Sequence, residues 1–301
     1  RSDLHGVFPK LNESIYKFRN IAKNHTDLKK YFSILDEHTQ IKDPHHPVTI
    51  KSIKGEICFN QVSFTYQEKN QPAIQDLSFT IRPGQSIALV GTSGGGKTTI
   101  TKLLMRFFDP DTGIITIDGI NIKNMTKSHL RSHMGVVPQE PILFNNTLKF
   151  NIAYGSNHQP SDQEIQAPAR LANLEEFIKE LPKGYQTQVG ERGIKLSGGQ
   201  KQRLAIARMI LAQPEIIVFD EATSQLDSKS EQLIQDAFWK ASKNKTTIII
   251  AHRLSTVTRA DKIFVIANGK IIETGSHNQL ISQPNSQYNQ FWKLQTSNNH
   301  K

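Results

Sequence analysis

An α/β fold built around a parallel β-sheet is predicted by three stretches of this 301-residue sequence. The stretches are short and almost continuously apolar: "SIALV" at 86–90, "EIIVFD" at 215–220 and "TTIIIAH" at 246–252. Such runs are typical of strands that are buried on both faces, as in parallel sheets. Helical patterns accompany them at 163–180, 198–212 and 229–242. The sequence therefore favours a parallel sheet whose crossovers are helices.

Four further stretches alternate apolar and polar residues, which predicts half-exposed antiparallel strands. They are "EICFNQVSFTY" at 56–66, "LSFTI" at 77–81, "GIITIDG" at 113–119 and "KIFVIANGKIIETG" at 262–275. The last is a hairpin around Asn268-Gly269, because Asn-Gly suits a two-residue turn. A helical insertion is expected near 140–195. The predicted architecture is thus an α/β core with a parallel sheet, an antiparallel β subdomain and a helical subdomain.

Three segments follow along the chain: a helical extension and linker at 1–48, the main domain at 49–285, and a tail at 286–301. A near-heptad apolar stripe predicts a helix that begins after Pro9 and ends near Asp36. The stripe consists of Leu11, Ile15, Phe18, Ala22, Leu28, Phe32 and Leu35. Its apolar face packs either on the chain's own domain or on a partner. The stretch "DPHHPV" at 43–48 is a proline-broken linker with two solvated histidines.

The composition excludes some functions and leaves others open. Lys and Arg exceed Asp and Glu by 37 − 27 = 10, which suits nucleic acid, anionic lipid or phosphate ligands. No basic tail or alternation of basic with aromatic residues selects among them. The single Cys58 excludes an internal disulfide. No apolar run of about 18 residues is present. The first residue is Arg1, which indicates a piece of a longer protein.

The stretch "GTSGGGKTT" at 91–99 fits the phosphate-loop pattern G-x-x-x-x-G-K-[ST] between a strand and a helix. Glycines let successive N–H groups point at a phosphate, and the following helix N-terminus adds partial positive charge. Ile100, Leu103, Leu104 and Phe107 give that helix an apolar face. The predicted nucleotide contacts are Gly91, Thr92, Ser93, Gly94, Gly95, Gly96, Lys97, Thr98 and Thr99. Lys97 is expected to reach the β- and γ-phosphates, and the Thr98 hydroxyl to bind Mg²⁺.

A buried strand ends in the two acids of "IIVFDE", 216–221. Asp220 is expected beside the Mg²⁺ site, bound through water. Glu221 points elsewhere and can polarise the attacking water as a general base.

A second phosphate-facing surface is predicted in "KLSGGQKQRLAIARMIL", 195–211, where Ser197 is a good N-cap for an amphipathic helix. It extends from Leu196 to Gln200. One nucleotide cannot easily use both surfaces of one compact domain. Two copies arranged head-to-tail can, with each copy supplying half of each site.

With these residues in view, "LSGGQ", "GTSGGGKTT" and "FDEATSQLD" resemble the nucleotide-binding domain of an ABC transporter over residues 50–285. The resemblance implies a P-loop NTPase core with ATP and Mg²⁺ as ligands, and it assigns roles by position. Tyr66 matches the aromatic residue that stacks on adenine, and Gln139 the residue that senses Mg²⁺ and the attacking water. Asp227 matches a loop that crosses the dimer, and His252 the switch histidine on the γ-phosphate. The signature matches are Ser197, Gly198, Gly199 and Gln200, which face the opposite subunit's ATP.

The motifs "GERGIKLSGGQKQR", "NNTLKFNIAYG" and "AHRLSTV" resemble single-chain exporters, in which a membrane domain precedes the ATPase. "FSILDEHTQIKD" and "NIAYG" lean toward mitochondrial-type exporters of heavy metals or glutathione conjugates. The resemblance implies a transmembrane domain in the same polypeptide, with residues 1–48 at its cytoplasmic end. It also implies an ATP-dependent homodimer that powers export at the cytoplasmic face of the cell inner membrane, without nucleic acid.

Two other classes of protein fit the sequence less well. Soluble ABC-type ATPases of translation and DNA repair usually carry two ATPase domains or a coiled-coil insertion, and this sequence shows one domain and no such insertion. A regulatory module without hydrolysis is disfavoured by Glu221 and His252.

Overall fold

The computed structural model describes residues 4–36, 39–68, 71–156, 158–190, 195–220, 228–251 and 253–298. The chain divides into two compact units, residues 1–42 and 43–301, each described by itself. The first unit is helix α1, Leu4–Leu35, which begins before Pro9 rather than after it and ends where predicted. Its apolar side chains are exposed, Phe18 at 75% and Leu35 at 76%. Within the described ranges, no helix is both long and apolar enough to cross a membrane.

The second unit is built on a six-stranded sheet in the order β10-β9-β3-β8-β7-β6. Its strands are β3 (Ser86–Val90), β6 (Met134–Val137), β7 (Ile216–Asp220), β8 (Thr246–Ile250), β9 (Lys262–Ala267) and β10 (Lys270–Gly275). All neighbours pair in parallel except β9 and β10, which form the predicted hairpin. The parallel strands β3, β7 and β8 are confirmed.

One expectation about this sheet was wrong, and one of its strands was not predicted. Strand β9 is buried and pairs in parallel with β3, although its sequence was expected to form a half-exposed antiparallel strand. Its partner β10 does alternate between half-buried and exposed residues. Strand β9 is buried because it lies inside the sheet between β10 and β3, whereas β10 is at the edge. Strand β6 was not predicted, because its four residues "MGVV" are too short to give a pattern.

The predicted antiparallel subdomain is a four-stranded sheet in the order β2-β1-β4-β5. Its strands are β1 (Ile57–Phe64), β2 (Ile74–Ile81), β4 (Thr112–Ile117) and β5 (Ile120–Asn121). Phe59 of β1 lies between Phe79 of β2 and Ile115 of β4, and the two phenylalanine rings stack at 4.6 Å. Such cross-strand aromatic pairs help to fix the register of a sheet.

The remaining elements are helical. The α-helices are α2 (Lys97–Leu104), α3 (Lys127–Ser132), α4 (Leu148–Ala153), α5 (Asp162–Leu171), α6 (Glu175–Glu180), α7 (Gly198–Ala212), α8 (Ser228–Ala241), α9 (Leu254–Val257), α10 (His277–Ile281) and α11 (Gln287–Asn298). The 3₁₀ helices are η1 (Ile122–Asn124) and η2 (Gly184–Gln186). The predicted helix 163–180 is two helices, α5 and α6, because Asn173 adopts a left-handed conformation between them.

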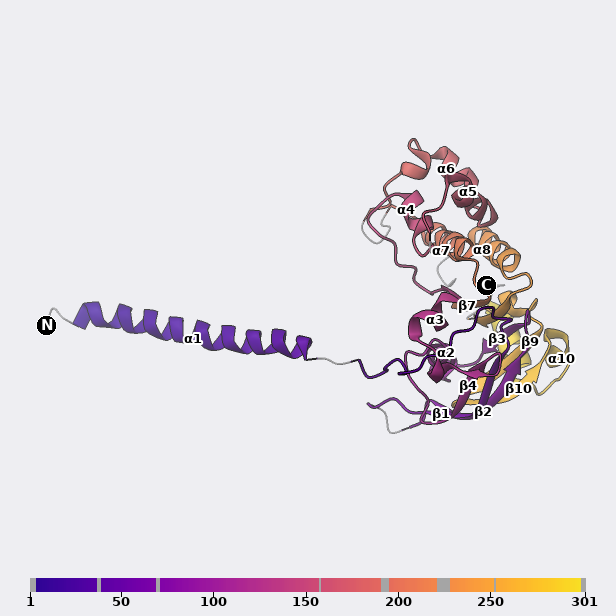
Figure 1. Ribbon diagram of the computed structural model, residues 1–301, viewed down its shortest axis with the longest axis horizontal. Helices are drawn as coiled ribbons and strands as arrows, with labels where there is room; N and C mark the ends of the chain where they lie inside the picture. Colours follow the sequence, from indigo (N-terminus) through magenta and orange to yellow (C-terminus); the bar gives the residue numbers. More distant parts are fainter. Residues whose placement is uncertain are drawn as a thin grey trace. The chain divides into compact units, whose positions relative to one another are not determined.

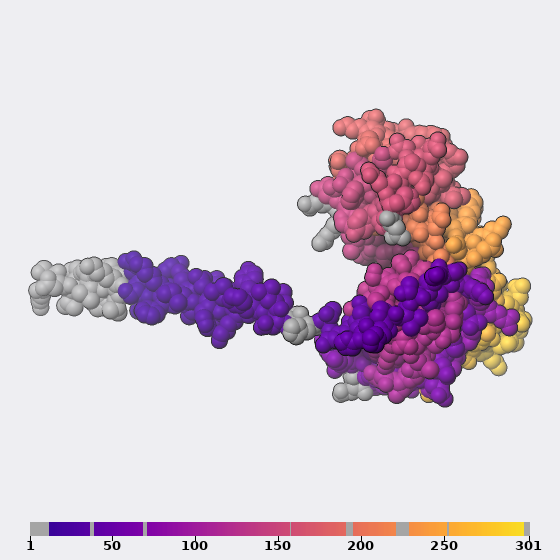
Figure 2. All heavy atoms as spheres, in the orientation of Figure 1, coloured from indigo at the N-terminus to yellow at the C-terminus, as the bar shows by residue number. Residues whose placement is uncertain are grey.

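The helical subdomain expected near 140–195 is present. Figure 1 shows α4, α5 and α6 gathered with α7 and α8 on one side of the second unit, away from β1 and β2. Figure 2 shows the same helices as a lobe of their own. Their core contains Ile165 of α5, Leu204 of α7 and Phe238 of α8.

Strand β3 separates two apolar cores because its side chains alternate between the faces of the sheet. Ile87 and Leu89 belong to the cluster shared with the four-stranded sheet and α2. Ala88 and Val90 belong to the cluster shared with the helical subdomain and α11, whose Tyr288 is fully buried. The strand that leads into the phosphate loop is therefore packed on both faces, which fixes the start of that loop.

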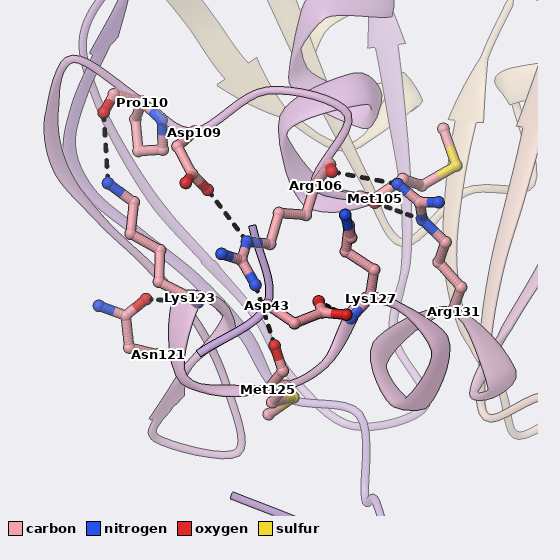
Figure 3. Close-up of polar contacts among 10 residues, drawn as sticks. All are labelled: Asp43, Met105, Arg106, Asp109, Pro110, Asn121, Lys123, Met125, Lys127 and Arg131. Atoms are coloured by element: carbon pink, nitrogen blue, oxygen red, sulfur yellow. Dashed lines mark hydrogen bonds and ion pairs between the residues drawn. The ribbon is translucent and has the colours of Figure 1, made fainter. Parts of the chain in front are cut away.

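Helix α2 is held at its C-terminal end by two arginines (Figure 3). Arg131 of α3 donates to the carbonyls of Met105 at 3.0 Å and Arg106 at 3.1 Å. The guanidinium of Arg106, 4% exposed, donates in turn to Asp109 and to the Met125 carbonyl. The helix itself ends at Leu104 because Arg106 is left-handed, with φ 54°, and the N–H groups of Arg106 and Phe107 donate to the carbonyls of Leu103 and Lys102. It therefore ends before the residue expected to complete its apolar face.

That residue is Phe107, which lies outside the helix and is 50% exposed. The Arg131 guanidinium lies 4.6 Å from its ring centroid. The other predicted apolar positions of the helix, Ile100, Leu103 and Leu104, are fully buried.

Candidate nucleotide-binding site

The phosphate loop and Asp220 lie where three neighbouring parallel strands end. Leu89 of β3 pairs with Ile250 of β8, which pairs with Asp220 at the end of β7. The phosphate loop follows β3 directly, so it lies at the same edge as Asp220. Ligands of open α/β sheets bind outside the carboxyl ends of the strands.

Glycine is required at both ends of the phosphate loop. Gly91 has φ +143°, and a Cβ there would lie 2.1 Å from the Ile266 carbonyl oxygen. Gly96 has φ +110°, and a Cβ there would lie 2.7 Å from the Ala73 carbonyl oxygen. Any other residue would clash with the backbone of β9 or of Ala73, which precedes β2, and would strain the loop. The loop therefore has its shape because these two positions lack side chains.

Lys97 is the first residue of α2, and its side chain turns back into the phosphate loop. Its side chain is 6% exposed, and its Nζ donates to the carbonyls of Gly91 at 2.8 Å and Thr92 at 2.9 Å. Burial lowers the pKa of this ammonium, and the negative charge of Asp220 opposes that shift. The charge of Lys97 is thus placed within the ring of backbone groups that would surround a phosphate.

The N-terminus of α2 is open. Its N-cap is Gly96, and no side chain caps its first N–H groups. Thr98, in the first turn, is exposed, whereas Thr99 is 7% exposed. Free N–H groups and the helix dipole at such a terminus favour an anion.

The described residues fit Mg²⁺ only as part of a nucleotide site. In the described part of the chain, no group of three or more His, Cys, Asp or Glu side chains is arranged to hold a metal. The exposed Thr98 hydroxyl and the Asp220 carboxylate offer oxygen ligands, which Mg²⁺ prefers. Since Mg²⁺ commonly takes its other ligands from phosphate and water, this sparse donor set suits it.

Tyr66 lies beside the start of α2. Its ring packs edge-on against Phe64 at 4.9 Å and Phe108 at 5.3 Å. Its hydroxyl shares a hydrogen bond with the Thr99 hydroxyl at 3.2 Å. The ring is half-buried and held in a fixed orientation, as an adenine platform requires. The link to Thr99 was not predicted from the sequence.

The signature segment caps its own helix. Ser197 Oγ accepts a hydrogen bond from the Gln200 N–H at 3.3 Å, and Gln200 Oε1 accepts one from the Ser197 N–H at 2.8 Å. This reciprocal pair is a capping box. Gly199 allows α8 to approach, since a Cβ there would lie 3.1 Å from Ser230 Cβ. Ser197 and Gly198 are exposed, so the predicted helix N-terminus faces outward.

Gln139 lies in the loop between β6 and α4, and its side chain is exposed. Its carbonyl oxygen accepts a hydrogen bond at 2.7 Å from Gln202 Nε2 of α7. Sequence analysis missed Gln202, but a signal was present. Gln202 is the polar side chain in the buried stripe of α7, which consists of Gly199, Gln202, Leu204, Ala205, Ile206, Ala207 and Met209.

Glu221, Asp227 and His252 lie outside the described residues, so their predicted roles stay predictions. Their flanks are described. Glu231 of α8, 8% exposed, pairs with Arg253, which directly follows His252. Ser255 also donates to Glu231, at 3.5 Å. The helix after the Asp227 segment and the residues after His252 are therefore joined by a buried carboxylate.

The fold and site define a class: an α/β nucleotide-binding domain with a phosphate loop and an inserted helical subdomain. The family model for the ABC transporter matches residues 74–224, half of the chain. The chain therefore belongs to the ABC transporter family, of which it carries the ATP-binding and ATP-hydrolysing domain.

Named relatives agree with the exporter subgroup that the motifs indicate. The chain is 49% identical over 278 residues to "ATP-binding cassette sub-family B member 6" of Homo sapiens, covering 92% of this chain and 33% of that protein. It is 45% identical over 275 residues to the "Heavy metal tolerance protein" of Schizosaccharomyces pombe, covering 91% and 33%. The chain thus spans about a third of the length of these relatives.

A solved structure of a bacterial Atm1-family ABC exporter with ATP bound is also similar. Its TM-score is 0.81 and its sequence identity 41%, and the match covers 97% of this chain and 50% of that chain. The described fold is therefore that of an exporter's ATP-binding domain.

Proposed function

We propose that this chain binds ATP and Mg²⁺ between two copies of itself and that ATP hydrolysis powers export by an attached membrane domain. One observation carries the proposal: the chain exposes two helix N-termini of different kinds. That of α2 follows a glycine loop around a buried lysine, and that of α7 presents the exposed Ser197 and Gly198. Each nucleotide would lie between the α2 terminus of one copy and the α7 terminus of the other.

The chain's own residues divide the chemistry. Lys97 and the loop N–H groups hold the β- and γ-phosphates, and Tyr66 orients the adenine. Glu221 accepts a proton from the attacking water, and His252 and Gln139 contact the γ-phosphate and that water. Thr98, Gln139 and, through water, Asp220 would hold Mg²⁺, which would neutralise phosphate charge there. Asp227 crosses to the second copy.

A membrane domain of the same polypeptide is the proposed partner. Four large apolar side chains are exposed soon after Gln139: Ile142 at 73%, Phe144 at 38%, Phe150 at 40% and Tyr154 at 48%. Phe144 and Tyr154 pack with tilted rings whose centroids are 4.2 Å apart, and the Arg208 guanidinium lies 5.4 Å from the Tyr154 ring centroid. Contiguous exposed apolar residues mark interaction surfaces. This surface would bind the membrane domain at the cytoplasmic face of the cell inner membrane.

The proposal is tested by replacing Glu221 with glutamine, which keeps the shape and removes the basic oxygen. We expect ATP binding to survive and turnover to fall about 10²- to 10⁴-fold, the usual contribution of a general base. Steady-state ATP hydrolysis and equilibrium binding of a fluorescent ATP analogue measure the two effects. A Glu221→Gln variant that hydrolyses ATP at nearly the normal rate would refute this assignment.

A further inference from the structure

A buried glutamine joins the signature helix to the loop that carries Gln139. Gln202 is 4% exposed and lies in α7, five residues after Ser197. One end of its amide lies 2.7 Å from the Gln139 carbonyl oxygen and 3.2 Å from the Pro138 carbonyl oxygen. Because both neighbours only accept hydrogen bonds, the atom facing them is the NH₂ group, which has two protons to donate.

The two ends of this contact belong to different parts of the site. Ser197 caps α7 and faces the second copy, about 7.5 Å along the helix axis from Gln202 at 1.5 Å per residue. Gln139 is at the start of the loop after β6, and its side chain is exposed. A helix transmits displacement as a rigid body, whereas a loop is located only by its contacts. The Gln202 amide is such a contact for the backbone of Gln139.

The other end of the amide shows that packing alone does not account for a glutamine here. Gln202 Oε1 is buried and has no hydrogen-bond partner among the residues that the structure describes. Burying an unpaired amide oxygen is unfavourable, and an apolar side chain of the same length would avoid that cost. Methionine is such a side chain. What glutamine adds at position 202 is the two hydrogen bonds that its amide donates.

We propose that Gln202 is a positioning residue for ATP hydrolysis: it fixes the Gln139 backbone to α7, so that Gln139 moves with the signature segment. The inference deepens the proposed function and rests on it. When the second copy's ATP locates Ser197, the same helix locates Gln139 in its own site. Gln202 touches no substrate and acts through Gln139.

The test uses the 301-residue chain with Gln202→Met, which keeps length and burial but donates nothing. Hydrogen exchange of the segment 139–147 should quicken at least about fivefold, while exchange in the phosphate loop stays unchanged. We expect the Kd for a fluorescent ATP analogue to stay within about twofold. The kcat for ATP should fall at least about tenfold, with a higher Mg²⁺ concentration needed for half-maximal rate.

A double-variant cycle separates positioning from general stability. In a Gln139→Ala background, Gln202→Met should cause no further loss of kcat, since the residue it positions is gone. The matched control is Asn289→Leu in α11. Asn289 is also a buried amide, and its Nδ2 donates to the Gln283 carbonyl at 3.1 Å, outside the segment 139–147. This control should lower the urea midpoint without changing the Mg²⁺ dependence.

Unchanged exchange at 139–147 in Gln202→Met would overturn the inference, whether or not the chain hydrolyses ATP. So would a loss of kcat that adds fully to that of Gln139→Ala. If Gln202→Met does not fold, Gln202→Asn shortens the reach by one methylene and should give the same effects more weakly. Failure of the unchanged chain to hydrolyse ATP would instead refute the proposed function and leave the exchange test of the Gln202 contact standing.

Discussion

Two helix N-termini of this chain are proposed to bind phosphate, and they are built in opposite ways. Helix α2 starts at Gly96, without a side-chain cap, behind a loop that surrounds the buried Lys97. Helix α7 starts at Ser197, which forms a capping box with Gln200. The α2 terminus thus leaves its N–H groups to a ligand, whereas the α7 terminus satisfies part of its own.

The difference indicates an order of binding. The α2 terminus combines free N–H groups, a helix dipole and a lysine, so it is equipped to hold nucleotide within one copy. The α7 terminus is already capped and has no glycine loop around a buried lysine, so we expect it to add to a nucleotide that is bound elsewhere. ATP held by α2 of one copy would then recruit α7 of the other.

The largest expected effect is a loss of stability when a side chain is added at the α2 terminus. Gly96→Ala places a Cβ 2.7 Å from the Ala73 carbonyl at φ +110°. Strain and overpacking should cost at least about 2 kcal/mol of unfolding free energy and weaken ATP binding. Gly199→Ala, at the α7 terminus, meets Ser230 Cβ at 3.1 Å without a positive φ. Urea unfolding of both variants should show the second within about 1 kcal/mol of the unchanged chain; equal losses would contradict the comparison.

The next effect concerns adenine, which only the α2 half-site is proposed to bind. Tyr66→Ala should weaken nucleotide binding by about 1–3 kcal/mol, the range for base–aromatic stacks. Tyr66→Phe keeps the ring but loses the hydrogen bond to Thr99, so it should cost less than about 1 kcal/mol. Calorimetric titration with ATP measures both. If Phe is as damaging as Ala, the hydroxyl rather than the ring carries the contact.

The structure of the site could be predicted only in part from the sequence. The glycine and lysine pattern at 91–99 and the buried runs at 86–90 and 246–250 identified the phosphate loop and its strands, because each depends on local sequence. The hydroxyl contact of Tyr66 and the Gln202 amide join residues 33 and 63 positions from their partners. No local pattern specifies such a pairing, although a polar residue in the buried stripe of α7 does signal one.

The fold shows the same limit. The hairpin at Asn268-Gly269 was predicted from its turn residues, whereas the parallel pairing of β9 with β3 depends on a strand about 175 residues earlier. The end of α2 is local but carries no usual sequence signal, because the left-handed residue that ends it is Arg106 rather than glycine or asparagine. The pairing of β9 was thus missed because it is distant, and the end of α2 because its residue type is unusual.

The smallest expected effect is a difference in acid sensitivity between two capped helices, α5 and α7. Ser161 and Glu164 cap α5 as Ser197 and Gln200 cap α7. Hydrogen bonds from the Ser161 backbone and side chain lower the pKa of Glu164 from 4.5 to about 2. Because the folded pKa is depressed, this stabilisation is present above pH 4.5 and is lost as pH falls toward 2.

The α7 cap uses glutamine, which does not titrate. Amide exchange of α5, but not of α7, should therefore quicken as pH falls from about 5 to 2, after correction for intrinsic exchange rates. Replacing Glu164 by glutamine should remove this pH dependence from α5. Equal acid sensitivity of both helices would contradict the assignment.

The most direct test of the shared site is the oligomeric state of the chain around ATP. We expect the Glu221→Gln variant to elute as a monomer without nucleotide and as a dimer with ATP and Mg²⁺ on a sizing column at low salt. The charge of +10 opposes pairing until the γ-phosphate bridges the two copies, so ADP should not produce the dimer. Adding Ser197→Arg should return the protein to a monomer that still binds ATP. Adding Ser161→Arg, which alters the other capping box, should leave the dimer intact. A Glu221→Gln/Ser197→Arg variant that stays dimeric with ATP would contradict the account.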